Sequence, residues 1–79
     1  MDIDNEISFI RLPQVLHKTT IPKSTLMEMI NEGEFPAPVA LSARSRAWVK
    51  SEVECWMQER IDKRNKKLAI LQVKNESNI

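Results

Sequence analysis

Residue types that do catalytic or metal chemistry are scarce in this 79-residue chain, which holds one histidine, His17, and one cysteine, Cys55. It shows no nucleophile–base pair, no set of metal ligands and no glycine-rich phosphate loop. His17 is predicted to be a surface residue at a helix end, and Cys55 a half-buried, inert thiol. The sequence therefore predicts a protein that is not an enzyme and that uses no metal or cofactor.

A different chemistry is indicated by Lys23, Ser24 and Thr25, which stand at the head of a short predicted helix. A helix N-terminus presents unpaired N–H groups and a partial positive charge, and both favour phosphate. A cation and two small hydroxyl groups placed there can reach a nucleic-acid backbone or a base edge. The alternative is that Ser24 and Thr25 only cap the helix and that Lys23 is solvated.

Two arginines, Arg44 and Arg46, fall in the turn region of a predicted hairpin over residues 38–50. An arginine at such a tip can contact phosphate or enter a narrow minor groove. Strand alternation places Arg46 on the face of Trp48, which is predicted to belong to the core, so Arg44 is the better candidate. The alternative is a solvated turn.

The elements that must position these residues are short. The second predicted helix carries Leu26, Met29 and Ile30 on one face and stops at Gly33. The third begins with Ser51, read as its cap, and carries an inward stripe. The predicted elements are a strand over 8–12, a helix from Pro13 to Lys18 or Thr19, a helix over 20–34 with Thr20 or Ile21 near its cap, the hairpin, and a helix over 51–67 with the stripe Val53, Trp56, Met57, Arg60 and Ile61.

The first two predicted helices are joined by only three or four residues, which is typical of a helix-turn-helix whose second helix reads DNA. A hairpin after it is a wing. The fold class is therefore predicted as mainly α with a small β-hairpin, a winged helix-turn-helix. Helix 22–32 is expected to read the major groove, and wing 38–49 to contact the backbone or minor groove. The residues predicted to contact DNA are Lys23, Ser24, Thr25, Arg44, Arg46, Lys18 and Thr20.

Composition fits one small domain, since 42% of the residues are hydrophobic and 29% are charged. The predicted organisation is a flexible acidic N-terminus over 1–8, a DNA-binding domain over 9–66 and an extension over 67–79. The extension is unexpectedly apolar, and it could lengthen the last helix, add a strand or pair with a second copy.

The net charge of +1 combines an acidic start with a mildly basic middle. The N-terminal residues are acidic and contain no apolar run, so the sequence predicts no signal peptide and no membrane span. A cytoplasmic protein is therefore expected.

The order of strand, helix-turn-helix, hairpin and long helix resembles the AlpA-type prophage regulators, which are related to MerR-like DNA-binding domains and to excisionases. The resemblance is carried by "IRLPQV", "IPKSTLMEMINEGEFPAPVAL" and "RSRAWVKSEVECWMQERI", and it covers roughly residues 9–61. The chain departs from the usual family pattern at Pro22, Met27 and Glu28.

The resemblance implies a sequence-specific DNA-binding transcription regulator of a prophage or integrated element, located with the nucleoid of a bacterium or phage-infected cell. Two other functions stay open. One is an excisionase-like directionality factor that bends attachment-site DNA, and the other is an interaction module that binds a regulator or the integrase. The expected partners are double-stranded DNA, a second copy in a homodimer or cooperative assembly, and such an integrase or regulator.

Overall fold

The computed structural model describes residues 6–77 as a mainly helical domain with one small sheet. Its elements in chain order are β1 (Phe9–Ile10), α1 (Leu12–Thr19), α2 (Lys23–Asn31), β2 (Val39–Ser42), β3 (Ser45–Val49) and α3 (Lys50–Ser77). The strands form an antiparallel sheet in the order β1-β3-β2. Two helices with a tight joint, followed by a hairpin, make a winged helix-turn-helix, so the predicted fold class is confirmed.

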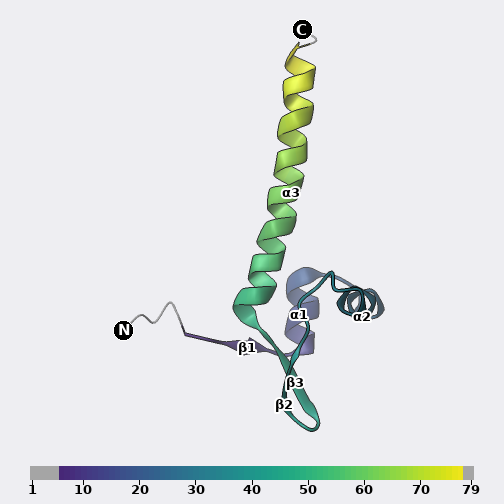
Figure 1. Cartoon of the computed structure of the whole chain (residues 1–79), viewed down its shortest axis with the longest axis vertical. Helices are drawn as coiled ribbons and strands as arrows, with labels where there is room; N and C mark the ends of the chain where they lie inside the picture. Colours follow the sequence, from purple (N-terminus) through teal and green to yellow (C-terminus); the bar gives the residue numbers. More distant parts are fainter. Residues whose placement is uncertain (1–5, 78–79) are drawn as a thin grey trace.

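The elements extend in three directions from the core (Figure 1). The long helix α3 projects one way, the β2–β3 hairpin projects the opposite way, and α2 lies to one side. The described chain is elongated, with principal extents of 60 × 38 × 20 Å. None of α1, α2 and α3 combines the length and the apolar character that a membrane span requires.

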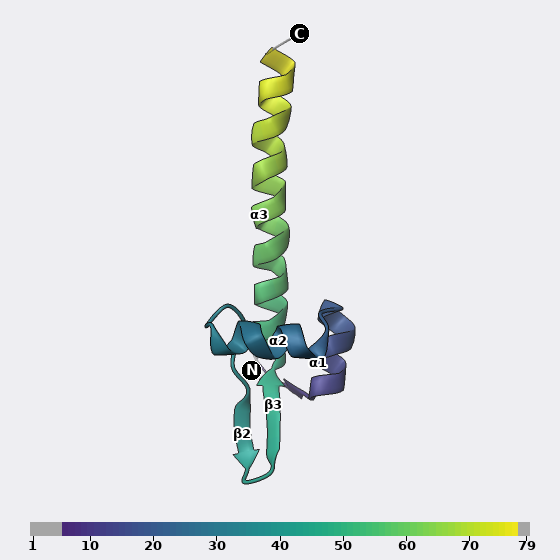
Figure 2. The same ribbon diagram turned by 90° about the vertical axis from the view of Figure 1, so that its right-hand side faces the viewer.

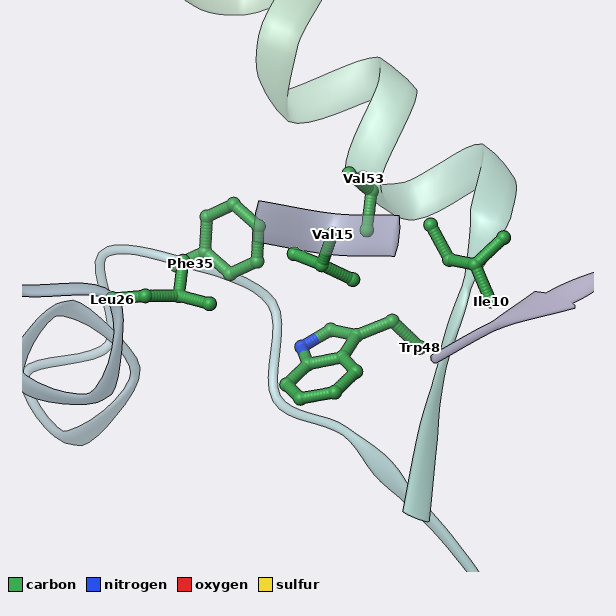
Figure 3. Close-up of a cluster of buried hydrophobic side chains, with 6 residues drawn as sticks. All are labelled: Ile10, Val15, Leu26, Phe35, Trp48 and Val53. Carbon is green, nitrogen blue, oxygen red and sulfur yellow. The ribbon is translucent and has the colours of Figure 1, made fainter. Parts of the chain in front are cut away.

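One hydrophobic cluster holds the helix-turn-helix and the wing together (Figure 3). Each element except β2 contributes to it, and the loop after α2 adds one more side chain. The Trp48 Nε1 group donates a hydrogen bond of 3.0 Å to the backbone oxygen of Pro36, so the indole is both buried and satisfied. The buried members are Ile10, Val15, Leu26, Phe35, Trp48 and Val53.

Trp56 joins this cluster from α3. Its ring meets Phe35 edge-on with the ring centroids 4.8 Å apart, and its Nε1 group donates a 2.7 Å hydrogen bond to the Glu34 oxygen. Both tryptophans therefore pack with the core, as the apolar spacing predicted.

Helix α2 is shorter than the predicted span over 20–34. Thr20 does not cap it, because Thr20 ends α1 in the left-handed conformation, with φ 60°. Pro22 is the cap of α2 and Lys23 its first residue. At the other end Gly33 has φ 75°, and the Gly33 and Glu34 amides donate to the oxygens of Ile30 and Met29. This is the Schellman arrangement, which confirms Gly33 as the helix stop.

Helix α3 differs from the prediction at both ends. It begins at Lys50, directly after β3, so Ser51 lies inside its first turn and is not the cap. It continues to Ser77, which answers the open question about the extension in favour of a longer helix. Cys55 is exposed and not half-buried, and Ile61 is 43% exposed and not part of the core. Ile61 is exposed because α3 leaves the domain after its second turn, whereas Cys55 lies within that turn on a side of the helix that the core does not cover.

Candidate nucleic-acid interface

The start of α2 presents polar groups to solvent. Lys23, Ser24 and Thr25 are all exposed, whereas Leu26 is fully buried and anchors the helix. The first internal helical bond of α2 runs from the Leu26 amide to the Pro22 oxygen, so the three preceding N–H groups point out of the helix end. The side chains of Ser24 and Thr25 form no hydrogen bond within residues 6–77, and the cap has no side-chain bond. The capping part of the alternative is therefore wrong, whereas its other part, a solvated Lys23, agrees with the exposure of that side chain.

The charge along α2 is polarised. Lys23 is at its N-terminus, while Glu28, the C-cap Glu32 and Glu34 lie on or beyond its second half. The helix dipole adds to this polarity, because its N-terminus is the positive end. An anionic ligand such as a nucleic-acid backbone is therefore favoured at the start of α2 and disfavoured at its end.

The turn of the hairpin is a two-residue connection, Ala43 and Arg44, between β2 and β3. Arg44 is exposed there, and Arg46 is exposed on β3 opposite Ala40 of β2. The pairing is irregular between Ala40 and Ser42, which is typical of a β-bulge near a hairpin end. Both predicted wing arginines thus lie beyond the core and face solvent.

Arg11 is a residue that the sequence reasoning missed. It precedes α1, and its Nη1 group donates a 2.7 Å hydrogen bond to the Ser45 hydroxyl and a 3.4 Å bond to the Arg46 oxygen. These bonds tie the start of α1 to the wing and add a cation beside Arg46. The only signal in the sequence is an arginine directly after the first strand, because the contact crosses 34 positions of the chain.

The remaining predicted residues lie at the turn between α1 and α2. The Lys18 Nζ group is 3.2 Å from Glu54 Oε2 of α3, so this cation is directed away from the start of α2. Thr20 is exposed next to that start, and its hydroxyl donates to the oxygen of Thr19. The structure therefore places Thr20 next to the start of α2, and it separates Lys18 from that cluster.

Five of the seven predicted site residues form two exposed groups. The first, called the α2 head, consists of Lys23, Ser24 and Thr25; the second, called the wing tip, consists of Arg44 and Arg46. Figure 2 looks onto the α2 side of the molecule and shows α2 crossing in front, with the hairpin below it. A ligand that approaches from this side meets both elements without obstruction from α3. No group of three or more His, Cys, Asp or Glu within residues 6–77 is arranged to hold a metal ion.

Comparison with known proteins gives the family. The family model described as prophage CP4-57 regulatory protein (AlpA) matches residues 8–61. An uncharacterized protein, ORF88, of Enterobacteria phage P4 is 45% identical over 60 residues, which cover 76% of this chain and 67% of that protein. The DNA-binding transcriptional activator AlpA of Escherichia coli K12 is 26% identical over 66 residues, covering 76% of this chain and 94% of that protein.

No solved structure matches the chain significantly. The family match nevertheless spans the helix-turn-helix, the wing and the first turns of α3, which are the parts that form the core and both exposed groups. It confirms the resemblance drawn from the sequence motifs. The chain belongs to the AlpA family of prophage regulatory proteins.

Proposed function

We propose that this protein is a sequence-specific DNA-binding transcription regulator of a prophage or other integrated element. The observation that carries the proposal is that the residues of the α2 head and the wing tip are exposed, on two elements, α2 and the β2–β3 hairpin, that are both seen from the α2 side of the molecule (Figure 2). The similar AlpA protein of Escherichia coli, whose name describes a DNA-binding transcriptional activator, supports the same assignment.

In the proposed complex α2 enters the major groove with its N-terminal end leading. The free amides of the α2 head and the Lys23 ammonium contact phosphate, while the hydroxyls of Ser24 and Thr25 reach base edges. The glutamates Glu28 and Glu32 favour this orientation, because they are repelled by phosphate and stay toward the outer end of the helix.

The wing supplies the second contact of the proposed complex. The Arg44 guanidinium at the tip contacts the flanking backbone or enters the minor groove. Arg11 acts as a positioning residue, because its bonds to Ser45 and to the Arg46 oxygen hold the wing in register with α1. Backbone contacts of this kind fix the protein on the duplex without reading sequence.

A salt-dependent binding assay tests both contacts. Binding to DNA from the flanks of the protein's own gene is measured against random DNA at several salt concentrations. Arg44→Ala is expected to weaken binding to both DNAs equally and to flatten the slope of log K against log salt by about 0.9 for one lost phosphate contact. Thr25→Ala is expected to weaken binding to the preferred DNA alone, by about fivefold for roughly 1 kcal/mol of hydrogen bonding.

The matched control is Lys66→Ala, which removes an exposed cation from α3, far from both groups. It should bind both DNAs like the parent. If Arg44→Ala and Thr25→Ala also bind like the parent while remaining folded, then the α2 head and wing tip do not form the DNA contact and the proposal fails.

A further inference from the structure

Helix α3 continues far beyond the core that anchors it. Met57 is its last residue packed against the hydrophobic cluster, and every residue over 58–71 is exposed. At 1.5 Å per residue, the helix runs about 30 Å past Met57. Most of the stability of a helix in a protein comes from packing an apolar face against other elements. Residues 58–71 of α3 lack such tertiary support.

An apolar stripe follows this projecting part in steps of four, three, four and three residues. This spacing repeats every 3.5 residues on average, so its members stay on one side of the helix, which is typical of a contact with another helix. Ile61, Leu68 and Leu71 are 43%, 47% and 46% exposed. The set, called the α3 seam, consists of Met57, Ile61, Arg64, Leu68 and Leu71.

The seam is continuous with the core, since Met57 belongs to both. The partner that fits it is a helix, because a flat or irregular surface does not follow a 3.5-residue repeat over two turns and more. The seam also contains one polar member, Arg64, at a position where a coiled coil normally carries an apolar residue. A charged residue there lowers the stability of a helix pair without preventing it.

The residues beside the seam indicate which helix can be the partner. One flank carries the cations Arg60 and Lys67, and the other carries the uncharged Gln58 and Asn65. In a parallel pair each flank meets the opposite flank of the partner, so a cation faces an amide and not another cation. A second copy of α3 in parallel orientation therefore matches both the spacing and the flanking charges, whereas an antiparallel copy would bring the flank of Arg60 and Lys67 against the same cationic flank of its partner.

We infer that the α3 seam is the contact surface for a second copy of this chain, which packs against it as a short parallel coiled coil. Arg64 keeps this association weak and reversible. The pair would carry two DNA-binding domains at the same end, so that two half-site contacts add.

Sedimentation velocity of the full chain without DNA tests the inference independently of DNA binding. The parent is expected to shift from monomer to dimer as its concentration rises, and Leu68→Asp to stay monomeric at every concentration. Arg64→Leu should lower the dimer dissociation constant at least tenfold, because it completes the apolar stripe. The matched control is Lys66→Leu, which makes the same change of charge and bulk on the opposite side of α3 and should leave the constant within twofold.

Circular dichroism and tryptophan fluorescence show whether each variant is folded, and none of the changed residues touches the core. In a Cys55→Ser background, Ile61→Cys should form an intermolecular disulfide on mild oxidation, because equivalent seam positions meet in a parallel pair. A parent that is monomeric throughout, or equal effects of Arg64→Leu and Lys66→Leu, would overturn the inference and point to a different partner. Failure of the disulfide in a dimerising variant would overturn the parallel arrangement.

Discussion

The neighbours Thr25 and Leu26 offer a direct test of how α2 is built. They are adjacent in sequence, yet Thr25 is exposed and Leu26 is fully buried as the one buried residue of α2. Changing each residue to alanine should therefore separate an effect on the stability of the fold from an effect on the proposed DNA binding. Leu26→Ala is expected to weaken the fold and Thr25→Ala to leave it almost unchanged.

The size of the Leu26→Ala effect follows from complete burial. Truncating a buried leucine costs about 2–5 kcal/mol of unfolding free energy, and full burial without solvent access favours the middle of that range, about 3 kcal/mol. The compact part of the chain, residues 8–61, has a total stability of only about 3–8 kcal/mol on ordinary per-residue values. For a domain this small, each kcal/mol lowers Tm by roughly 4–8 °C, so the expected shift is about 12–24 °C.

The assay is thermal unfolding followed by tryptophan fluorescence. Trp48 is 4% exposed and reports on the core, whereas circular dichroism would also record the projecting part of α3. Thr25→Ala should move Tm by no more than about 3 °C, since an exposed substitution away from special contacts changes stability by about 0.5 kcal/mol or less. Equal shifts for the two variants, or a shift below 3 °C for Leu26→Ala, would refute the assignment of Leu26 as the anchor of α2.

Three further changes test other contacts. Gly33→Ala should cost about 1–2 kcal/mol from backbone strain alone, because its φ is 75° and no atom lies within 4 Å of the added Cβ; chemical denaturation measures this, and Gly33→Asn should cost less. Lys18→Ala should cost about 0.5 kcal/mol or less, since both partners of its pair with Glu54 are partly exposed, and a double-mutant cycle checks the coupling. Arg11→Ala should speed amide hydrogen exchange in the β2–β3 hairpin while leaving exchange in α2 unchanged, because only the wing loses a hydrogen bond.

Local patterns predicted those parts of the fold that depend on neighbouring residues. The stripe of Leu26, Met29 and Ile30 and the stop at Gly33 are properties of a single helix, and they were correctly placed. Trp48 and Trp56 were assigned to the core for the same reason. The α2 head was recognised from a different local signal, the residue types at the start of the helix, and its three residues are exposed.

The features that were missed depend on distant contacts. The Ser51 capping motif predicts a helix start at Ser51, yet the Lys50 amide donates to the oxygen of Ser8, the residue before β1, which lets the helix follow β3 without a separate cap. The left-handed Thr20 was not foreseen, because threonine rarely adopts this conformation and nothing local requires it. The bond from Arg11 to the wing likewise joins segments that no local pattern connects.

Because β3 passes directly into α3, the wing and the projecting helix form one rigid body. Val49 ends the strand and Lys50 begins the helix, so the chain has no loop at this point in which a rotation could be absorbed. Helix α3 is about 42 Å long at 1.5 Å per residue. A tilt of the hairpin by about 10° would therefore carry the far end of α3 sideways by about 7 Å on the same geometry. A small adjustment of the wing against its ligand would become, at the far end, a displacement larger than a turn of helix.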